Sequence, residues 1–319
     1  MTPGEPTILV AADVSDQHID QIRAAAPGAR IERSLDRARL LELAPQADVI
    51  VGWNVPRDVV QRAARLRWIH STAAGVDQLL YPEVTERGIL LTGSSGIHAT
   101  SISEHVLALA LAHSRRLPQA IRHQVARRWD RSSTIGWELA GQTMGILGLG
   151  AIGQALAARA AALGMRVIGT KRTPGVLPGV ERVFGPDGLD EVLAASDVLV
   201  IILPLTEQTR GLIGARELAL MKPSAFLINV ARGAIVQEEA LIAALSAGAL
   251  AGAGLDVFER EPLPQDSPLF GMEQVIMTPH VSGAMPGYYD RVIPLFCENV
   301  RRYRAGEPLL NVVDFARGY

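Results

Sequence analysis

Short apolar runs alternate with helical patterns over the first hundred residues of the chain. The segments TILVAA at 7–12 and DVIVGW at 48–53 are almost continuously apolar, as strands buried on both faces are. The segment 16–27 instead repeats its apolar residues at helical spacing. Crossover helices between buried parallel strands produce this alternation, so we predict a small α/β domain here. Two further strands are expected at 67–75 and 88–95, with a helix that opens with proline at 56–66.

A longer series of the same kind begins at Thr143. It follows a buried helix expected from about Thr100 to Arg115 and a charged stretch at 122–141, interpreted as a helix and an irregular surface segment. Six strands in series, with helices between them, predict an open, doubly wound parallel sheet of the Rossmann type. The strands are expected at 143–148, 166–170, 196–203, 224–230, 251–257 and 274–280. The helices are expected at 151–163, 188–196, 215–221 and 237–248, and the tail from Gly287 is mostly helical.

The composition narrows the class of protein. A chain of 319 residues predicts two domains, although no Gly/Ser-rich linker separates them. A net charge of −2 favours neither nucleic acid nor an anionic membrane as a partner. The one cysteine, Cys297, allows no disulfide within the chain and fits a reducing compartment. The start MTPGEP lacks the order of a signal peptide, and no apolar run approaches the ~20 residues of a membrane helix, so we expect a cytoplasmic protein.

A glycine pattern stands at the start of the second series. Gly148, Gly150 and Gly153 form GxGxxG, which is a weak signal by itself. Here a strand precedes it, a helix follows and another strand completes a βαβ unit. The first glycine permits a tight turn, the second lets the backbone approach a pyrophosphate, and the third lets helix and strand pack closely. Because a helix N-terminus also attracts phosphate, we predict a dinucleotide site rather than a plain strand–turn–helix.

The residues after the next strand bear on the choice of dinucleotide. An acidic residue about 20 positions after the glycines normally accepts hydrogen bonds from the adenosine ribose. This chain has Thr170 near that position, followed by Lys171 and Arg172. A threonine flanked by two cations attracts a 2′-phosphate, which a carboxylate would repel. We therefore predict NADP(H) in preference to NAD(H); the alternative is that both cations are solvated loop residues.

Ionisable residues follow three later strands. Arg232 comes after 224–230, Asp256 and Glu261 after the next strand, and His280 after the last. In an open α/β sheet ligands bind outside the carboxyl ends of the strands, so these residues should share the edge that holds the glycine loop. His280 has the chemistry to exchange a proton with a hydroxyl or carbonyl oxygen, Glu261 to hold the other imidazole nitrogen, and Arg232 to grip a keto acid. Singly, each has an ordinary structural explanation, but together they favour reduction of a 2-keto acid.

Other residues offer weaker signals. A metal site would need His98, His105 and His113 to gather, but His105 and His113 are eight positions apart, the wrong spacing for ligands on adjacent turns, and no Cys or Asp cluster joins them. These histidines are interpreted as core or interface residues, and no metal site is expected. Trp53, at a strand end, is equally consistent with a substrate pocket and with a packed aromatic. Tyr288 and Tyr289 are candidates for the pocket or for a subunit contact.

Five segments together resemble the D-isomer-specific 2-hydroxyacid dehydrogenase family. They are GILGLGAIG, LPLTEQTRGLI, INVARGAIV, LDVFEREP and TPHVSG, in the family's order, and the resemblance runs from about Ala73 to the C-terminus. It implies a flavodoxin-like substrate domain built from both termini, at 1–98 and 286–319, and a dinucleotide-binding Rossmann domain at 99–285. It also implies an Arg–Glu–His catalytic set of Arg232, Glu261 and His280, and commonly a homodimer.

The resemblance implies further site residues. The loop STAAGVD would bind the substrate carboxylate through the N–H groups of Ala74, Gly75 and Val76, and Asp256 would meet the nicotinamide carboxamide. Arg232 and His280 would also contact substrate, and Trp53 is a further candidate only from its place at a strand end. The remaining cofactor contacts would come from Ala151, Ile152, Leu203, Pro204, Thr209, Val230, Ala231, Arg232, His280 and Gly283.

At Thr170 the chain departs from the NAD-using pattern. It is similar there to the NADPH-preferring hydroxypyruvate/glyoxylate reductases of the family, although use of NAD(H) stays possible. The expected activity is reduction of a small 2-keto acid to a D-2-hydroxy acid. One alternative is a binding module like the family's dinucleotide-sensing corepressors, and another is phosphite or formate oxidation. The complete Arg–Glu–His set favours the reductase.

Overall fold

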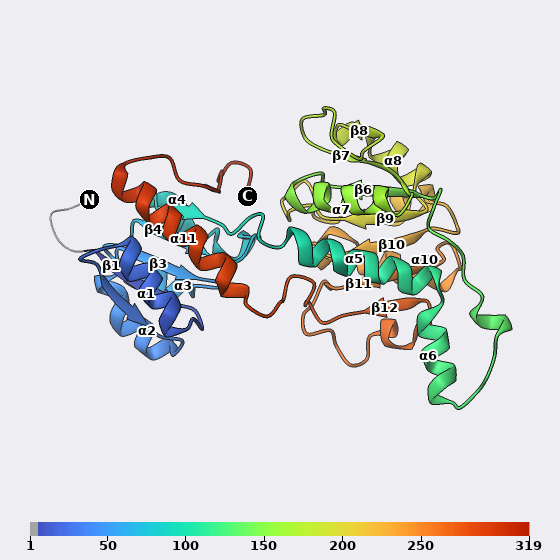
Figure 1. Ribbon diagram of the computed structural model, residues 1–319, viewed down its shortest axis with the longest axis horizontal. Coiled ribbons are helices and arrows are strands. Elements are labelled where there is room, and N and C mark those ends of the chain that lie inside the picture. The colour runs from blue at the N-terminus through green and yellow to red at the C-terminus, as the bar shows by residue number, and fades with distance from the viewer. Residues whose placement is uncertain (1–5, 319) are drawn as a thin grey trace. The chain divides into compact units, whose positions relative to one another are not determined.

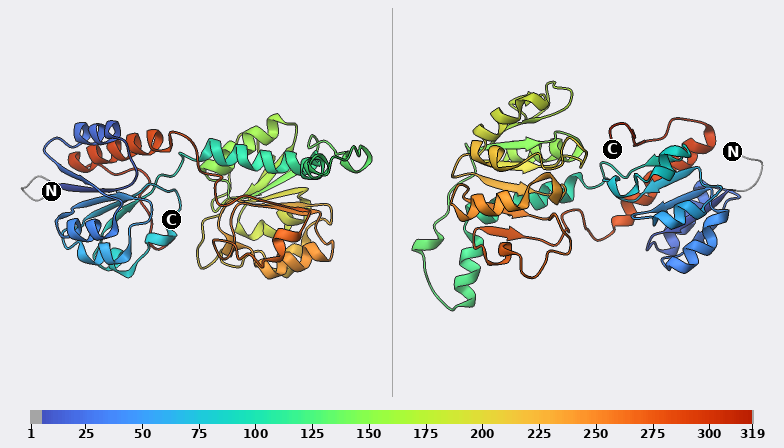
Figure 2. Two further views of the ribbon diagram at one scale, coloured as in Figure 1. Left: turned by 90° about the horizontal axis from the view of Figure 1, so that it is seen from below. Right: turned by 180° about the vertical axis from the view of Figure 1, so that it is seen from behind.

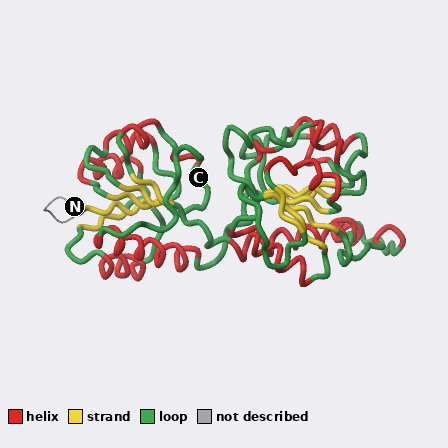
Figure 3. The backbone as a smooth tube through the Cα atoms, turned by 90° about the horizontal axis from the view of Figure 1, so that it is seen from above, coloured by secondary structure: helices red, strands yellow, loops and turns green. Residues whose placement is uncertain are grey.

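The computed structural model describes residues 6–318, which divide into two compact units. The first unit comprises the described residues up to Ile97 together with those from Met285 onwards, and the second comprises His98–Ala284. Each unit is built on a parallel β-sheet with helices on both of its faces (Figures 1 and 3). The α/β class predicted from the sequence is therefore confirmed.

Within residues 6–318, the first unit has a five-stranded sheet in the order β2-β1-β3-β4-β5, and every neighbouring pair is parallel. This is the flavodoxin-like order. The strands are β1 (Thr7–Ala11), β2 (Arg30–Arg33), β3 (Val49–Gly52), β4 (Trp68–Ser71) and β5 (Leu90–Thr92). The helices are α1 (Asp16–Ala25), α2 (Arg37–Leu43), α3 (Arg57–Arg62), α4 (Pro82–Glu86) and α11 (Tyr288–Ala305).

Both faces of this sheet are buried, which explains the continuous apolar runs. Along β1, Leu9 enters one hydrophobic cluster and Ile8 and Val10 enter the other, on the opposite face. The second of these clusters includes residues of α1 and α11, which pack against each other. The last long helix of the chain thus completes the core begun by its first strands.

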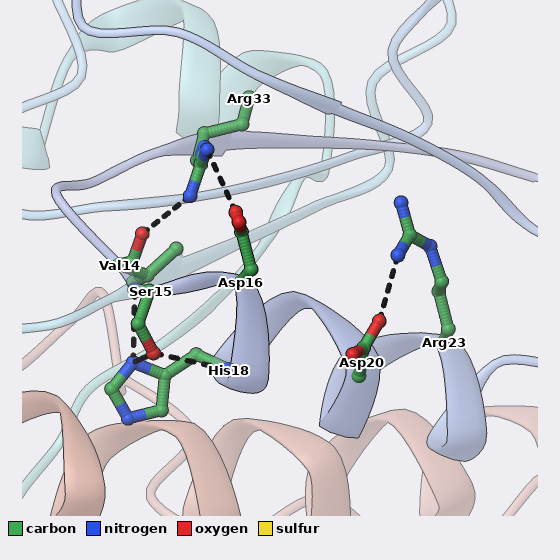
Figure 4. A network of polar contacts seen from close by, with 7 residues as sticks. All are labelled: Val14, Ser15, Asp16, His18, Asp20, Arg23 and Arg33. Atoms are coloured by element: carbon green, nitrogen blue, oxygen red, sulfur yellow. Dashed lines mark hydrogen bonds and ion pairs between the residues drawn. The ribbon is translucent and has the colours of Figure 1, made fainter.

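The start of α1 is fixed by a reciprocal pair of hydrogen bonds (Figure 4). The Ser15 hydroxyl accepts a bond from the His18 backbone N–H, and the His18 Nδ1 accepts one from the Ser15 backbone N–H. Because Nδ1 is an acceptor, the proton of the neutral ring lies on Nε2, which is 2.8 Å from Asp290 Oδ1 on α11. The cap of α1 and the first turn of α11 are therefore joined through one imidazole.

The second unit, within the described residues, has a seven-stranded parallel sheet in the order β12-β11-β10-β9-β6-β7-β8. The order reverses between β6 and β9, as in Rossmann folds. The strands are β6 (Thr143–Leu147), β7 (Arg166–Thr170), β8 (Arg182–Phe184), β9 (Val198–Ile201), β10 (Phe226–Asn229), β11 (Gly252–Leu255) and β12 (Val275–Met277). The helices are α5 (Ala99–Ser114), α6 (Leu117–Val125), α7 (Ala151–Ala162), α8 (Leu189–Ala195), α9 (Ala215–Leu220) and α10 (Glu238–Ser246).

Helices again cover the two faces of this sheet. On one face α5 packs against α7, over a cluster that contains Ile146, Val200 and Ile228 (Figure 2). On the other face, Leu199 and Leu227 lie in a cluster with residues of α8, α9 and α10. No helix in residues 6–318 is both long and apolar enough to cross a bilayer.

The structure contains two strands that the sequence analysis missed, β2 and β8. Each lies at an edge of its sheet and pairs with one neighbour. Neither has a fully buried residue, because one side of an edge strand faces solvent. Periodicity therefore gave no signal at RIER or RVF. The helix expected within 122–141 also begins earlier, at Leu117, and the chain after Val125 is irregular apart from a short 3-10 turn at Ser132–Thr134.

Candidate active site

Segments that follow the strands of the second sheet meet at one edge because all its strands run in the same direction. The glycine loop, at 148–150, follows β6, and the switch point beside it is flanked by 202–209 after β9. The residues singled out by the sequence analysis lie at this edge, at 148–153, 170–172, 203–209, 230–232, 256 and 278–280.

Each of the three glycines in the loop is explained by a different feature of the structure. Gly148 has a φ of 108°, which residues with a side chain rarely adopt. A Cβ on Gly153 would lie 2.2 Å from the Gly148 carbonyl oxygen, so helix α7 could not pack at this distance with any other residue. A Cβ on Gly150 would meet nothing within 4 Å. The chain itself therefore requires Gly148 and Gly153, whereas the space over Gly150 is open to an incoming group.

Helix α7 begins at this open space. Gly150 is its N-cap and supplies no side-chain hydrogen bond to the first turn, which contains Ala151 and Ile152. The unpaired N–H groups of a helix start, with the positive end of the helix dipole, form a site for phosphate. Leu203 Cδ2 would lie 3.4 Å from a Cβ on Gly148, so the loop after β9 borders the glycine turn.

The predicted cofactor-selecting residues are joined to the glycine loop by hydrogen bonds. The Thr170 carbonyl accepts bonds from the N–H groups of Gly148 and Leu149, at 3.3 and 2.9 Å. Thr170 itself is buried, Lys171 is half-buried and Arg172 is exposed. Two cations therefore follow the strand end that lies against the glycine turn.

His280 and Glu261 are in direct contact. Nδ1 of His280 lies 2.7 Å from Oε2 of Glu261, and the other carboxylate oxygen accepts the Phe258 backbone N–H at 3.0 Å. A carboxylate only accepts hydrogen bonds, so Nδ1 carries the proton and Nε2 is turned to the other side of the ring. His280 also has a φ of 54°, an uncommon backbone conformation for a residue with a side chain. The pair is thus a fixed carboxylate and an oriented imidazole.

Arg232 lies on the turn after β10. Its carbonyl accepts a bond from the Asn229 side chain at 3.0 Å, and the next residue, Gly233, is where the turn meets the Glu261 loop. A Cβ on Gly233 would lie 1.9 Å from the Phe258 carbonyl carbon. This close approach packs the Arg232 turn against the loop that holds Glu261.

Asp256 grips the loop that carries His280. Its carboxylate accepts bonds from the Thr278 hydroxyl at 2.6 Å and from the N–H groups of Val281 and Ser282, both at 2.9 Å. Burial would raise the pKa of this carboxyl, but these hydrogen bonds outweigh it and hold the pKa below its usual range. The side chain is 0% exposed, so the structure assigns Asp256 to the loop, and its contact with a nicotinamide stays a prediction.

The other expected cofactor residues lie in or beside these loops. The Thr209 hydroxyl donates to the Pro204 carbonyl at 2.7 Å and shapes the turn after β9. Val230 and Ala231 are buried at the end of β10. A Cβ on Gly283 would lie 3.0 Å from the His98 ring, which accounts for the glycine by packing alone.

The predicted carboxylate-binding loop lies in the first unit, after β4. The N–H groups of Ala74, Gly75 and Val76 make no hydrogen bond to the described residues. The three preceding carbonyls are all held: Ser94 donates to those of Ser71 and Ala73, both at 2.9 Å, and the Tyr288 hydroxyl donates to that of Thr72 at 2.6 Å. The loop is therefore a braced turn whose N–H groups stay available for an anion.

Tyr288 and Trp53, in the first unit, differ in their surroundings. Burial raises the pKa of Tyr288 to about 12, so its hydroxyl remains a donor to the loop. Tyr288, a candidate for the pocket or for a subunit contact, anchors the turn through its hydroxyl. Trp53, just after β3, is 62% exposed and so is not a packed core residue.

Two histidines of α5 lie in different surroundings. His105 Nε2 lies 3.0 Å from the Thr278 hydroxyl, whereas His113 stacks on Phe226 with ring centroids 3.9 Å apart. Among residues 6–318, no group of three or more His, Cys, Asp or Glu side chains is placed to hold a metal ion. The contacts of His105, Thr278 and Tyr288 were missed because each joins positions far apart in the sequence.

Comparison with known proteins gives consistent matches. The family model of the D-isomer specific 2-hydroxyacid dehydrogenase NAD binding domain matches residues 107–282. A glyoxylate reductase from Thermococcus gammatolerans is 36% identical over 317 residues, which cover 95% of this chain and 94% of the relative. The chain spans 58% and 59% of the length of two D-3-phosphoglycerate dehydrogenases that it also matches.

Two solved structures are similar over nearly the whole chain. A D-isomer specific 2-hydroxyacid dehydrogenase from Xanthobacter autotrophicus Py2, in complex with NADPH and MES, has a TM-score of 0.86 and 36% identity, over 99% of this chain and 100% of that chain. The NADPH-dependent glyoxylate/hydroxypyruvate reductase from Sinorhizobium meliloti, in complex with NADP and sulfate, has a TM-score of 0.87 and 31% identity over the same shares.

Proposed function

The chain belongs to the D-isomer specific 2-hydroxyacid dehydrogenase family, and from this premise we propose that it transfers a hydride between NADP(H) and a small 2-keto or D-2-hydroxy acid. The acid we propose is of the glyoxylate or hydroxypyruvate class, as the names of the reductases with similar sequence and structure suggest. The observation that carries the proposal is the contact between His280 and Glu261, on the sheet edge that also bears an open glycine turn.

His280 is the proposed general acid and base. Its Nδ1–H is donated to Glu261, so Nε2 is the atom that gives a proton to the developing alkoxide in reduction and takes it back in oxidation. Glu261 fixes the orientation and tautomer of the ring, and its own position is fixed by the Phe258 N–H. The bound nicotinamide would supply or accept the hydride.

Two groups of hydrogen-bond donors are proposed to bind the substrate: the Arg232 guanidinium and the backbone N–H groups of the turn after β4. Arg232 would polarise the keto oxygen and bind the carboxylate, since a guanidinium can donate to two oxygens at once. The N–H groups of Ala74, Gly75 and Val76 would bind the carboxylate, and the braced carbonyls of the same turn support this role. Trp53, exposed at the end of β3, is proposed to contact the substrate side chain.

The activity is tested with a panel of keto acids. NADPH and NADH are each offered with glyoxylate, hydroxypyruvate, pyruvate and phenylpyruvate, and loss of reduced-cofactor absorbance is followed. We expect turnover with glyoxylate, hydroxypyruvate or both, and we expect it to be faster with NADPH than with NADH. A protein that binds NADPH but turns over none of the four would overturn the proposal in favour of a dinucleotide-sensing binding module.

The NADP(H) preference has its own test. Charge reversal in Arg172→Glu is expected to lower the ratio of kcat/KM for NADPH to that for NADH by about tenfold or more, since a charge-assisted hydrogen bond would become a repulsion. Arg128→Glu is the matched control because it makes the same charge change at an exposed position of the irregular segment after α6. An unchanged ratio in Arg172→Glu would remove this residue from cofactor selection.

A homodimer is the proposed assembly. Leu117, Ile121 and Val125 recur every four residues on α6 and are all exposed, and Trp129 just beyond is 98% exposed. Monomers rarely expose such a contiguous apolar stripe, so we propose that a second copy covers it. Light scattering should give twice the chain mass for the native protein and a lower mass for Ile121→Asp; a native monomer would contradict the assignment.

A further inference from the structure

A chain of hydrogen bonds runs from helix α5 to the loop of His280. Nε2 of His105 lies 3.0 Å from the Thr278 hydroxyl, and that hydroxyl lies 2.6 Å from Oδ1 of Asp256. The Asp256 side chain is fully buried, and His105 itself is largely buried. All three residues belong to the second unit, although 173 positions separate His105 from Thr278.

The direction of each bond in this chain can be assigned. An ionised carboxylate only accepts, and the hydrogen bonds to Asp256 keep its pKa low, so the hydroxyl proton of Thr278 points to Asp256. The lone pairs of the same hydroxyl then face His105, and Nε2 must carry a proton to make the bond. His105 therefore donates to Thr278, which donates to Asp256.

The far end of the chain holds the backbone around His280. Asp256 accepts the N–H groups of Val281 and Ser282, and its carbonyl accepts the His280 N–H at 2.8 Å. His280 is itself exposed and has the uncommon φ of 54°, so the loop needs external contacts to keep this conformation. Asp256 thus supplies three of the hydrogen bonds that hold this backbone, beside the contact of the His280 ring with Glu261.

We propose that His105 and Thr278 are positioning residues for the proton-transferring imidazole, acting in series through Asp256 on the backbone of 280–282. This inference rests on the proposed role of His280. His105 orients the Thr278 hydroxyl, Thr278 orients the buried carboxylate, and the carboxylate holds the backbone that aims the ring. Neither His105 nor Thr278 is required to touch substrate or cofactor.

Two readouts test the series. The first is amide hydrogen exchange of the segment 278–284, which reports the bonds to Val281 and Ser282 without any turnover. The second is kcat for the preferred keto acid, measured beside the Kd for NADPH. In His105→Leu we expect exchange of this segment to quicken and kcat to fall, each by about tenfold, while the Kd for NADPH stays within about twofold of its native value.

Conservative variants separate positioning from mere packing. His105→Gln retains an N–H donor at the side-chain end and is expected to restore most of kcat and of the exchange protection. Thr278→Val keeps the shape but loses the hydroxyl, and should resemble His105→Leu. Because the two residues act in series, the double variant His105→Leu/Thr278→Val should be no slower than Thr278→Val alone.

His113→Leu is the matched control. It removes another histidine of α5, one that stacks on Phe226 rather than bonding to the loop, and should leave exchange at 278–284 and kcat unchanged. Native exchange in both His105→Leu and Thr278→Val would overturn the inference, as would losses of kcat that multiply in the double variant. If the native protein reduces no keto acid, the proposed function fails, and the exchange measurements alone decide whether the series holds the loop. If His105→Leu does not fold, Thr278→Val gives the same test.

Discussion

Loops follow the strands of both sheets at the carboxyl edge, but different kinds of group hold them in place. In the first unit, the turn after β4 is braced by uncharged donors, the hydroxyls of Ser94 and Tyr288 and the Ser94 N–H. In the second unit, the turns after β11 and β12 are held by two carboxylates, those of Asp256 and Glu261. The turn after β4 is therefore braced by neutral groups, whereas the turns after β11 and β12, here called the ionisable edge, are held by charged ones.

The buried polar groups beneath each edge follow the same division. His70, next to the braced turn, has its pKa lowered to about 3 by burial, so it is a neutral hydrogen-bonding group at physiological pH. Asp256 is as deeply buried but keeps its charge because three donors face it. A neutral scaffold suits the recognition of an anion by backbone N–H groups, whereas fixed charges suit the movement of protons. Under the proposed function, the braced turn of the first unit would contribute to carboxylate binding, and proton transfer would fall to the second unit alone.

The sharpest test of the ionisable edge is removal of its imidazole. His280→Ala should lower kcat by about 10³-fold, within the range that general acid–base catalysis contributes, because the proposed proton donor and acceptor is removed. The glycine turn is unaffected by the change, so the Kd for NADPH should stay near its native value. Single-turnover reduction and NADPH fluorescence titration measure the two quantities. Turnover within tenfold of native would remove His280 from the chemistry.

The glycine turn of the second unit offers a matched pair of variants. Gly150→Ala places a methyl group in open space and should leave the melting temperature unchanged while it weakens NADPH binding, by about 100-fold if the methyl meets a phosphate. Gly153→Ala forces a Cβ against the Gly148 carbonyl oxygen and should lower the melting temperature, since overpacking of this kind costs about 1–3 kcal/mol. Thermal melts and NADPH titration distinguish the two. Native affinity in Gly150→Ala would show that the open space does not receive the dinucleotide.

The sequence predicted the parts of the fold that are buried on both faces. Strands such as 143–148 and 48–53 carry continuous apolar runs because helices cover both sides of their sheets. The edge strands β2 and β8 escaped because their residues are half solvated, and RIER and RVF do not differ from loop sequences. The chain changes units at 97 and 285, where no change of composition marks the crossing.

The candidate site divides in the same way. The glycine turn and the His280–Glu261 contact could be predicted because their residues stand in short motifs directly after strands of the same sheet. The hydrogen bonds that brace the turn after β4 could not be predicted, because Tyr288 and Thr72 are 216 positions apart. The sequence around a tyrosine does not show whether it lines a pocket or supports a turn. Long-range hydrogen bonds of this kind depend on the packing of whole elements, which no local pattern specifies.

The neutral imidazole of His70, next to the braced turn, predicts a dependence of stability on pH. Folded His70 has a pKa of about 3, whereas the unfolded chain titrates at the ordinary value of 6.5, so below that value the unfolded state binds the extra proton. The contribution of His70 to the free energy of unfolding is therefore fully present above pH 6.5 and is lost as the pH falls from 6.5 towards 3. At pH 5 the loss is about 2 kcal/mol.

Urea unfolding at pH 7 and pH 5 measures this loss, with His70→Gln as the comparison. The variant should lose about 2 kcal/mol less than the native protein between the two pH values. Burial also lowers the pKa of His113, in the second unit, to about 4. His113 is present in both proteins, so its contribution to the loss of stability cancels in the comparison. Equal losses would mean that His70 is charged or exposed in the folded state.

The smallest effect is expected at the brace that Tyr288 provides. Tyr288→Phe removes one neutral hydrogen bond to the Thr72 carbonyl, which is worth about 0.5–1.5 kcal/mol. Because the braced turn is assigned to carboxylate binding and not to chemistry, the loss should appear as a KM for the keto acid raised about three- to tenfold, with kcat and the Kd for NADPH unchanged. Steady-state kinetics over a range of keto acid concentrations measure the split.

Tyr289→Phe is the matched control for this variant. It removes a hydroxyl from the adjacent residue of α11, whose ring lies against His18 and not against the turn after β4, so the KM should keep its native value. A fall in kcat in Tyr288→Phe without a change in KM would contradict the division between the two edges. The braced turn would then contribute to the chemical step, and the separation of binding from proton transfer would have to be abandoned even if every residue of the ionisable edge behaved as expected.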